Sequence, residues 1–389
     1  MKCRLVLISL VAMISLRAAQ PQSPAGPAAI QRIAKSDRSG TAWSVRVPDG
    51  ALVFTGQIAA ADSAGDARAQ ADKALQALDA VLVEAGSDRT RVVRLNAYVA
   101  DDRSIVGVQA AVAARFGDAP PAFTLVRTPL SAAGAVVAFE AVAATSRAPS
   151  AVEVHGATAA VLPAGGKIFT SGQVVKGADL ASSVKLTMAG LHRSVAHLGL
   201  KKSDIVQVKA FITPFADHAA AAREVAASFD GAPVPPTVLL EWVSDLFTEI
   251  EVVVSARSLP AHAPAPITYD WFPWLTKSPR FSHVGLVTAG TPLIFIGAIE
   301  GGDSVGARSQ MKTIFERLGS VLFDAGSSYR MLAKATYYLA DPQARALLGD
   351  IRAVYYDPAR PPAASVLDVN GLGLAGRTAM LDIVAVPLK

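Results

Sequence analysis

The most constraining feature of this chain of 389 residues is a pattern that occurs three times along it. Each copy begins with a short apolar run, rich in β-branched and aromatic residues, that ends at a glycine. The three runs end at Gly56, Gly172 and Gly297. Recurrence at an interval of roughly 110–130 residues indicates repeated structural units, so one continuous core for the whole chain is excluded.

An amphipathic helix, a strand and a second helix follow each of these runs. Apolar residues recur three or four positions apart in three segments, which is the period of a helix that buries one face. These segments are residues 71–82, 184–198 and 311–322, and each stops shortly before a glycine suited to ending a helix. We predict strands next at 92–99, 205–212 and 331–339, and second helices at 105–116, 219–229 and 343–355.

Each copy closes with a proline pair and two further strands, the last of which carries a characteristic acidic residue. These acids are Glu140, Glu251 and Asp382. The fold class predicted from this order is α+β, with three tandem ββαβαββ domains. We place the domains at residues 43–147, 154–257 and 280–389. Residues 20–42 and the Pro- and Trp-rich residues 258–279 are predicted to be linkers.

The first residues of the chain have the character of a secretory signal peptide. Lys2 and Arg4 precede an apolar stretch from Leu5 to Leu16, and small residues follow at Ala18 and Ala19. We therefore predict a signal peptide at residues 1–19 and a periplasmic or secreted protein; a leader that stays uncleaved as an anchor is the alternative. After its removal no apolar run is long enough to span a bilayer, so no stable membrane span is expected.

Charge and cysteine content limit the partners and cofactors. The formal net charge is +5, and three of the basic residues lie in the predicted signal peptide, so the remaining chain is close to neutral. Because it has no basic run interleaved with aromatic residues, we predict no nucleic-acid partner. The single cysteine, Cys3, and six scattered histidines form no ligand spacing, so we predict neither a metal site nor a cofactor.

The ordered motifs resemble those of the RidA/YjgF family. The first copy carries Thr55-Gly56-Gln57, Glu84-Ala85-Gly86, Pro121-Ala122-Phe123 and a closing Glu140-Ala141-Val142-Ala143. The second copy keeps Ser171-Gly172-Gln173 and Glu251, and the third keeps Asp324-Ala325-Gly326, Pro362-Ala363-Ala364 and Asp382. The resemblance covers most of the chain and rests on the recurrence of these motifs in order.

This resemblance implies a fold, an assembly and a chemistry. Members of the family fold like chorismate mutase and form homotrimers around a central β-barrel. Clefts between neighbouring subunits bind small carboxylate-bearing molecules, and the best-known members hydrolyse enamines and imines to keto products and ammonia. Three fused units are therefore expected to form an intramolecular pseudo-trimer around a central β-barrel, and the chain is expected to be a monomer.

The family holds the substrate carboxylate with an arginine that directly follows its Pro-Ala motif. The matching positions in this chain hold Phe123, Thr237 and Ala364. Hydrogen bonds from a guanidinium contribute roughly 1.5–3 kcal/mol each, so their loss would weaken carboxylate binding by orders of magnitude. Arg127, four residues beyond Phe123 on the same strand face, is a candidate replacement, and a solvated strand-end charge is the alternative.

Several other residues are candidates for these clefts. The closing acids Glu140, Glu251 and Asp382 either activate water as general bases or hydrogen-bond neighbouring groups and stabilise the contact between units. The remaining candidates either contact the ligand or serve turns and packing, and they are Thr55, Gln57, Ser171, Gln173, Trp43 and Phe281.

The sequence leaves two functions open. The first is an exported protein that binds a small molecule at clefts between the repeats without turnover. The absence of arginine after all three proline motifs favours this function and a neutral or apolar ligand, or a protein partner. The second is a hydrolase of the enamine/imine deaminase type that uses Glu140 or Glu251.

Overall fold

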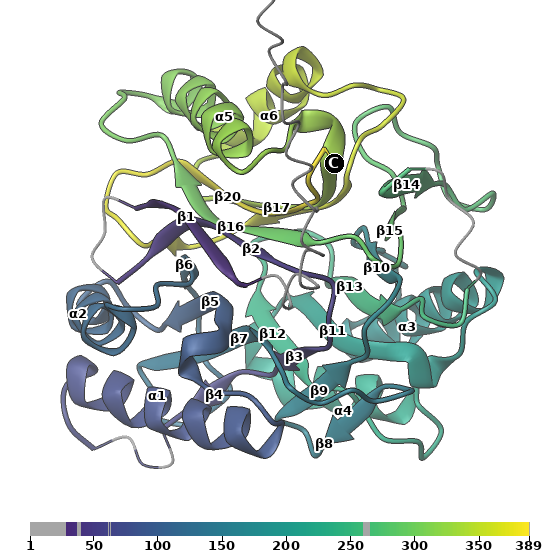
Figure 1. The fold of residues 1–389 in the computed structure, drawn as a ribbon, viewed down its shortest axis with the longest axis horizontal. Helices are drawn as coiled ribbons and strands as arrows, with labels where there is room; N and C mark the ends of the chain where they lie inside the picture. Colours follow the sequence, from purple (N-terminus) through teal and green to yellow (C-terminus); the bar gives the residue numbers. More distant parts are fainter. Residues whose placement is uncertain (1–28, 37–39, 61, 63, 260–264, 389) are drawn as a thin grey trace, which may run out of the picture.

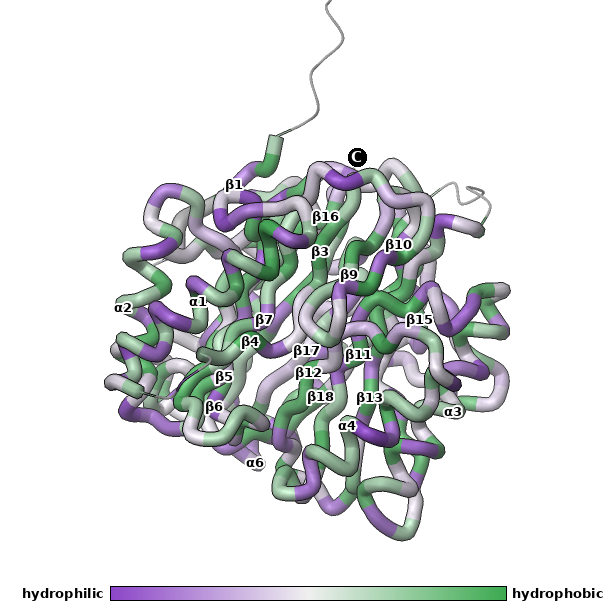
Figure 2. The backbone as a smooth tube through the Cα atoms, turned by 90° about the horizontal axis from the view of Figure 1, so that it is seen from below, coloured by the Kyte–Doolittle hydropathy of each residue, from purple (hydrophilic) through white to green (hydrophobic). Residues whose placement is uncertain are grey.

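The computed structural model describes residues 29–36, 40–60, 62, 64–259 and 265–388. The predicted signal peptide, residues 1–19, lies outside this part of the chain. Three pairs of helices lie around the outside of the molecule, with the strands between them (Figure 1). Apolar residues concentrate along the strands, whereas the outer helices and loops carry many of the hydrophilic ones (Figure 2). No helix in the described ranges is both long and apolar enough to cross a bilayer.

The chain forms three units with the same order of elements, which confirms the predicted repetition. The first unit contains β1 (Gln31–Lys35), β2 (Ala42–Val47), β3 (Leu52–Thr55), β4 (Ile58–Ala59), α1 (Ala67–Glu84), β5 (Val92–Val99), α2 (Ser104–Phe116), β6 (Ala122–Arg127) and β7 (Val137–Ala144). The second contains β8 (Glu153–His155), β9 (Ala159–Leu162), β10 (Lys167–Thr170), α3 (Leu180–His197), β11 (Ile205–Ile212), α4 (His218–Ala227), β12 (Thr237–Glu241) and β13 (Thr248–Ser255). The third contains β14 (Ile267–Asp270), β15 (Val284–Val287), β16 (Leu293–Glu300), α5 (Ala307–Asp324), β17 (Leu332–Leu339), α6 (Pro342–Tyr355), β18 (Ala363–Asp368), β19 (Gly371–Leu372) and β20 (Ala379–Ala385).

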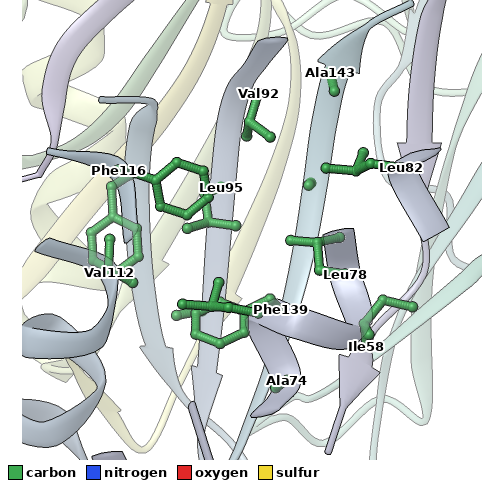
Figure 3. Packing of buried hydrophobic residues seen from close by; sticks show 14 of the residues in the cluster. Ile58, Ala74, Leu78, Leu82, Val92, Leu95, Val112, Phe116, Phe139 and Ala143 are labelled. Carbon is green, nitrogen blue, oxygen red and sulfur yellow. The ribbon is translucent and has the colours of Figure 1, made fainter. Parts of the chain in front are cut away.

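Within each unit, two helices pack their apolar face on strands of the same unit. In the first unit, Leu78 and Leu82 of α1 lie against Leu95 of β5 and Phe139 of β7 (Figure 3). All four side chains are buried, and each contributes roughly 1.5–3 kcal/mol through the removal of apolar surface from water. The apolar residues spaced at the helical period in the sequence therefore form the buried face of the helix, as predicted.

The first helix of each unit ends at the glycine that the sequence indicates. Gly86, Gly199 and Gly326 follow α1, α3 and α5 with φ values of 73°, 76° and 69°. This left-handed backbone conformation is unfavourable for residues with a Cβ, so the glycine turns the chain out of the helix.

The N-terminal hairpin of each unit pairs with the preceding unit rather than with the strand that follows it in sequence. β2 pairs antiparallel with β16, β9 with β3, and β15 with β10. The registers are equivalent, because Val47 faces Leu293, Leu162 faces Leu52 and Val287 faces Lys167. The first and second units each receive a strand from the next unit, and the third receives one from the first.

A single closed barrel, which the family resemblance implied, is not found among the described strands. They form a fourteen-stranded sheet, which joins the first and third units and includes β8 and β9 of the second, and a separate six-stranded sheet of the second and third units. To close the sheets into one barrel, the N-terminal hairpin of each unit would have to pair over several residues with the strand that follows the proline pair. That contact is one residue pair in the first unit, Ala42 with Ala122, and an isolated pair in the third, Ser282 with Ala363.

Two segments predicted to be linkers contain strands. β1 lies within the predicted linker 20–42 and pairs with β2, and β14 lies within 258–279 and pairs with β15. Both correspond to β8 of the second unit, which pairs with β9. The proline- and tryptophan-rich composition that suggested a linker has another cause: Phe272 is buried and stacks on Trp274 at 5.3 Å against the core of the second unit.

Removal of the first hairpin should destabilise the third unit. β16 lies between β2 and β20, and Val45 and Val47 of β2 are buried. A chain that begins at Pro48 should therefore aggregate or melt at a clearly lower temperature than one that begins at Ala29, because an apolar strand edge becomes exposed. Solubility and thermal unfolding by circular dichroism measure the effect. Equal melting temperatures for the two chains would contradict the exchanged pairing.

Candidate functional site

Each unit meets the next at a seam where a glycine at or near the end of the central strand's apolar run faces the strand that follows the proline pair. Gly56 lies against Thr237, Gly172 hydrogen-bonds Ala364, and Gly297 lies against Phe123. A Cβ at Gly297 would collide with the backbone of Phe123, so this close approach requires glycine. The three positions that match the family's arginine therefore lie one at each seam.

At two of these seams, residues predicted to contact a ligand make contacts within the protein. At the seam between the first and second units, the Gln57 amide donates to the carbonyl of Leu239 at 3.0 Å and accepts from its N–H at 3.2 Å. At the seam between the third and first units, the Phe123 ring is 4% exposed and packs into the core of the first unit. Gln57 and Phe123 thus act as structural contacts between or within units.

The seam between the second and third units contains a cleft of about 390 Å³. Its volume lies in the range of small-molecule sites. Predicted residues Ala364 and Phe281 line it, and so does Gly172. The other lining residues are Glu249, Arg280, Arg345, Ala346, Leu348, Gly349, Asp350, Arg352 and Val366.

Three arginines from other elements line this cleft, although none follows the proline motif. Arg345 and Arg352 come from α6, and Arg280 comes from the loop before β15. Arg345 pairs with Asp368 at 3.2 Å. Arg352 is 7% exposed and lies over the ring of Tyr337 at 5.1 Å, and its Nε and Nη1 have no hydrogen-bond partner among the residues the structure describes.

One sequence signal could have identified Arg352. Ala344 and Leu348 precede it at four-residue intervals, so all three share one face of α6, and all three are buried. A charged residue on the apolar stripe of a helix needs a partner or a ligand. The family motif indicates an arginine only in the strand after the proline pair, so Arg352 was not predicted.

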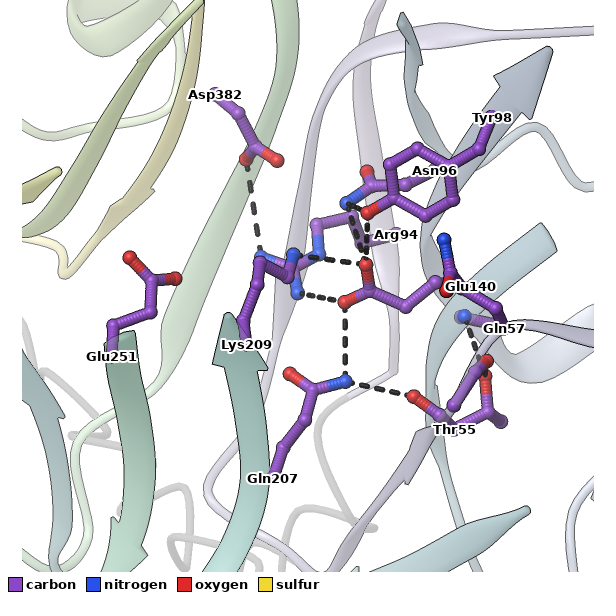
Figure 4. Close-up of polar contacts among 12 residues, drawn as sticks. Thr55, Gln57, Arg94, Asn96, Tyr98, Glu140, Gln207, Lys209, Glu251 and Asp382 are labelled. Carbon is purple, nitrogen blue, oxygen red and sulfur yellow. Dashed lines mark hydrogen bonds and ion pairs between the residues drawn. The ribbon is translucent and has the colours of Figure 1, made fainter. Parts of the chain in front are cut away.

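The three closing acids meet at the centre of the molecule rather than in the cleft. Each lies directly opposite a polar residue of the neighbouring strand: Glu140 opposite Asn96, Glu251 opposite Lys209, and Asp382 opposite Thr336. Figure 4 shows the three carboxylates around Lys209 and Arg94. The shared register places three acids at equivalent positions of three units.

Glu140 is surrounded by donors from two units. From the first unit it accepts hydrogen bonds from Arg94 at 3.2 Å, Asn96 at 3.3 Å and Tyr98. From the second unit it accepts from Gln207 at 3.1 Å and Lys209 at 2.9 Å (Figure 4). Burial alone would raise the pKa of Glu140, but Lys209 and Arg94 outweigh it and hold this pKa at about 2.

The other two acids also face basic groups, in part from other units. Glu251 accepts from Lys334 at 2.6 Å and from Ser365 at 2.5 Å. Asp382 lies 3.9 Å from Arg94, and burial raises its pKa against the pull of Arg94 and Lys209. A cavity of about 20 Å³ lies among these groups, which is room for roughly one water molecule.

The surroundings of Glu140 bear on both of the roles predicted for it, general base and structural contact. A general base works best with a pKa near the operating pH and with a free lone pair towards the substrate. Glu140 has a pKa of about 2, is 1% exposed and already accepts from five residues. With Glu251 and Asp382 it joins the three units through ion pairs between them.

The remaining candidates contact other residues of the chain, several of them in a neighbouring unit. Ser171 donates to the Ser282 carbonyl at 2.5 Å, and the side chain of Gln173 donates to Ser194 at 3.0 Å. Trp43 lies under Arg317 at 5.3 Å, in the third unit's core. Arg127 pairs with Asp102 at 3.0 Å and donates to the Asn370 carbonyl, so it is no replacement within the cleft.

The structure changes one alignment between the repeats. The hydroxyl of Thr55 accepts from Ala141 N–H at 2.9 Å, and that of Thr170 accepts from Val252 N–H at 3.0 Å. Thr170, rather than Ser171, therefore occupies the position equivalent to Thr55.

In the part of the chain that the structure describes, no three His, Cys, Asp or Glu side chains are grouped to hold a metal ion.

Comparisons with known proteins agree with the motifs. The family profile described as Endoribonuclease L-PSP matches residues 38–145. A member of the YjgF/YER057c/UK114 family from Mycobacterium tuberculosis is 30% identical, covering 27% of this chain and 87% of its own, with a TM-score of 0.23. The YjgF gene product from E. coli is 28% identical, covering 24% and 83%, with a TM-score of 0.23. An uncharacterised protein from Pseudomonas aeruginosa is 24% identical, covering 30% and 99%, with a TM-score of 0.24.

The comparison with curated proteins gave no match. These three similar structures cover between 24% and 30% of this chain. The profile match and the relative matched over 87% of its length, together with the repeated motifs, show that the chain belongs to the RidA/YjgF family.

Proposed function

We propose that this chain binds one small organic acid in the cleft between its second and third units. In this proposal the three units are arranged around a pseudo-threefold axis. Each unit corresponds to one subunit of the homotrimer that the family resemblance implies. The cyclic pairing of β2, β9 and β15 supports that arrangement. The contacts of Gln57 and Phe123 at the other two seams support a single working cleft.

The observation that carries the proposal is the buried guanidinium of Arg352 in the wall of the cleft. Its side chain is nine-tenths buried, it lines the cleft, and two of its nitrogen atoms have no acceptor among the described residues. A buried donor without a partner costs roughly 1–3 kcal/mol. A ligand carboxylate could accept two parallel hydrogen bonds from it, and Arg280 adds a second positive charge to the same cleft.

This proposal replaces the preference for a neutral ligand that the sequence favoured. The cleft contains three arginines and two acids, Glu249 and Asp350. One of the arginines, Arg345, is paired with Asp368 outside the lining set. An anionic ligand would therefore meet Arg280 and Arg352 as its partners.

Calorimetric titration with pyruvate and its neutral amide, pyruvamide, tests the proposal. We expect pyruvate to bind once per chain and at least about tenfold more tightly than the amide, because only the acid pairs with a guanidinium. Inorganic phosphate is the third probe and reports whether any anion suffices. Absence of saturable binding for pyruvate and phosphate, or equal affinities for the acid and the amide, would contradict the proposal.

A second candidate function is hydrolysis of a carbon–nitrogen double bond, which the position of Glu249 in the cleft favours. In this reaction water adds to the carbon, and Glu249 accepts a proton from the water and passes it to nitrogen. Glu249 then takes the proton of the new hydroxyl group and delivers it to the amine, so the carbon–nitrogen bond breaks and ammonia leaves from a keto product. Accelerated release of keto acid in a coupled dehydratase assay, abolished by Glu249→Gln, would support it. Rates equal to the uncatalysed hydrolysis would exclude it for that substrate.

We also propose that the protein is exported and works as a monomer. Residues 1–19 support export, and cell fractionation tests it. Each N-terminal hairpin is already paired within the chain, so we expect light scattering after size exclusion to give the mass of one chain. A stable trimer of chains would contradict the fused arrangement.

A further inference from the structure

Glu249 is a carboxyl group in the cleft that only the second unit has. It lies on β13 opposite Phe211 of β11. The equivalent positions of the first and third units hold Ala138, opposite Tyr98, and Met380, opposite Tyr338. Glu249 therefore occurs at this one seam, whereas the closing acids Glu140, Glu251 and Asp382 occur once in every unit.

The surroundings of Glu249 differ from those of Glu251 on the same face of the strand. Glu251 is paired with Lys334 and Ser365 at the centre, whereas Glu249 lines the cleft, where Lys334 and Ser365 also lower the pKa of its carboxyl group. A Cβ at position 172 would collide with the Glu249 carboxyl group, so Gly172 provides the space in which this carboxyl lies.

Charged groups from four elements face this carboxyl. Glu251 lies two residues along β13, and Lys334 approaches from β17. Across the cleft are Arg280, from the loop before β15, and three residues of α6. The residues of α6 are Arg345, Asp350 and Arg352.

We propose that the cleft takes up its organic acid together with a proton and that Glu249 holds this proton. The inference rests on the proposed binding of an acid. A ligand anion held by Arg352 and Arg280 shares one partly dehydrated cleft with the Glu249 carboxylate. Two like charges at such a site repel each other, so the bound state favours the neutral carboxyl.

The proton affinity of Glu249 suits this role. Burial raises the pKa of Glu249 to about 7, Lys334 acts to lower it, and Glu251 adds to the rise. Near neutral pH the empty cleft is thus partly protonated, and a second negative charge shifts the group further towards its neutral form. By linkage, the ligand then binds more tightly where Glu249 is already protonated.

Titration calorimetry with pyruvate from pH 5.5 to 8.5, with bis-Tris and Tris compared near pH 7 as two cationic buffers of different ionisation enthalpy, tests this inference. We expect the affinity to fall about tenfold over this range and the two buffers to give different heats near pH 7, because binding takes up a proton. The wild-type heats in two buffers measure proton uptake without any variant. Glu249→Gln should retain binding and lose both the pH dependence and the buffer dependence.

Asp350→Asn is the matched control, because it removes the other acid of the cleft and should leave the pH dependence in place. Wild-type binding that is independent of pH and buffer would overturn the inference and leave the acid-binding proposal standing. The same pH slope in Glu249→Gln would also overturn it. If pyruvate and phosphate fail to bind at every pH, the proposed function fails and this inference fails with it.

Discussion

Replacing Glu140 with glutamine should lower the free energy of unfolding by about 3–5 kcal/mol, the range for breaking a buried ion pair. The variant leaves Arg94 and Lys209 buried beside a neutral side chain that cannot balance their charge. Because Glu140 accepts from the first and second units, the loss should act on the contact between them. Urea unfolding at neutral pH measures the change.

Two comparisons separate this effect from a general effect of the substitution. Glu316→Gln removes an exposed carboxylate that pairs with Lys312 on α5, and it should change stability by less than about 0.5 kcal/mol. Adding Lys209→Met to Glu140→Gln should restore part of the loss, because the unpaired buried ammonium is removed. A Glu140→Gln protein as stable as the wild type would refute the role of the central acids.

The pH dependence of the same pair of proteins gives an independent measurement. The folded-state pKa of Glu140 is about 2, below its ordinary value of 4.5. Its ionisation therefore contributes stability that is fully present above about pH 4.5 and is lost as the pH falls towards 2. The stability difference between wild type and Glu140→Gln should shrink as the pH is lowered from 5 to 3.

Replacing Arg352 with methionine should have opposite effects on binding and on stability. Loss of two charge-assisted hydrogen bonds should weaken pyruvate binding about a hundredfold or more. The ligand-free protein should become more stable by about 1–2 kcal/mol, because methionine fills similar space without buried, unpartnered donors. Calorimetric titration and urea unfolding of the empty protein measure the two effects.

Arg317→Met is the matched control for Arg352→Met. Arg317 also lies over an aromatic ring, that of Trp43 at 5.3 Å, but it donates to the Glu300 carbonyl at 3.0 Å and lies outside the cleft. Its replacement should lower stability and leave pyruvate binding unchanged. If Arg352→Met instead destabilises the protein and still binds pyruvate, Arg352 has a structural role and the proposed site is wrong.

Much of the fold within a unit could be predicted from local sequence. The apolar stripe of α1 and the glycine after it depend on contacts and backbone angles within a few residues, so the helix and its end were placed correctly. The strands β5, β11 and β17 were also recognised, because each is a short apolar run between turns. The pairing of β2 with β16 was not predicted, since the four residues between β2 and β3 also suit a local hairpin.

The candidate site was predicted less well than the fold. The motifs located Gly172, Ala364 and Phe281, and these residues line the cleft. Glu249 and Arg352 were missed because neither belongs to a motif, and each acts through what another unit or element places opposite it. The closing acids were recognised as important, but their partners Lys209 and Lys334 lie in other strands and other units.

Local patterns were enough to establish that this chain contains three like units, because helix period, strand composition and helix-ending glycines depend on near neighbours. Membership of the RidA/YjgF family followed from motifs of the same local kind. The location and chemistry of the cleft depend on which side chains of different units lie within a few ångströms of each other. Such contacts join residues more than a hundred positions apart, as between Glu251 and Ser365 at 2.5 Å, and only the folded structure brings them together.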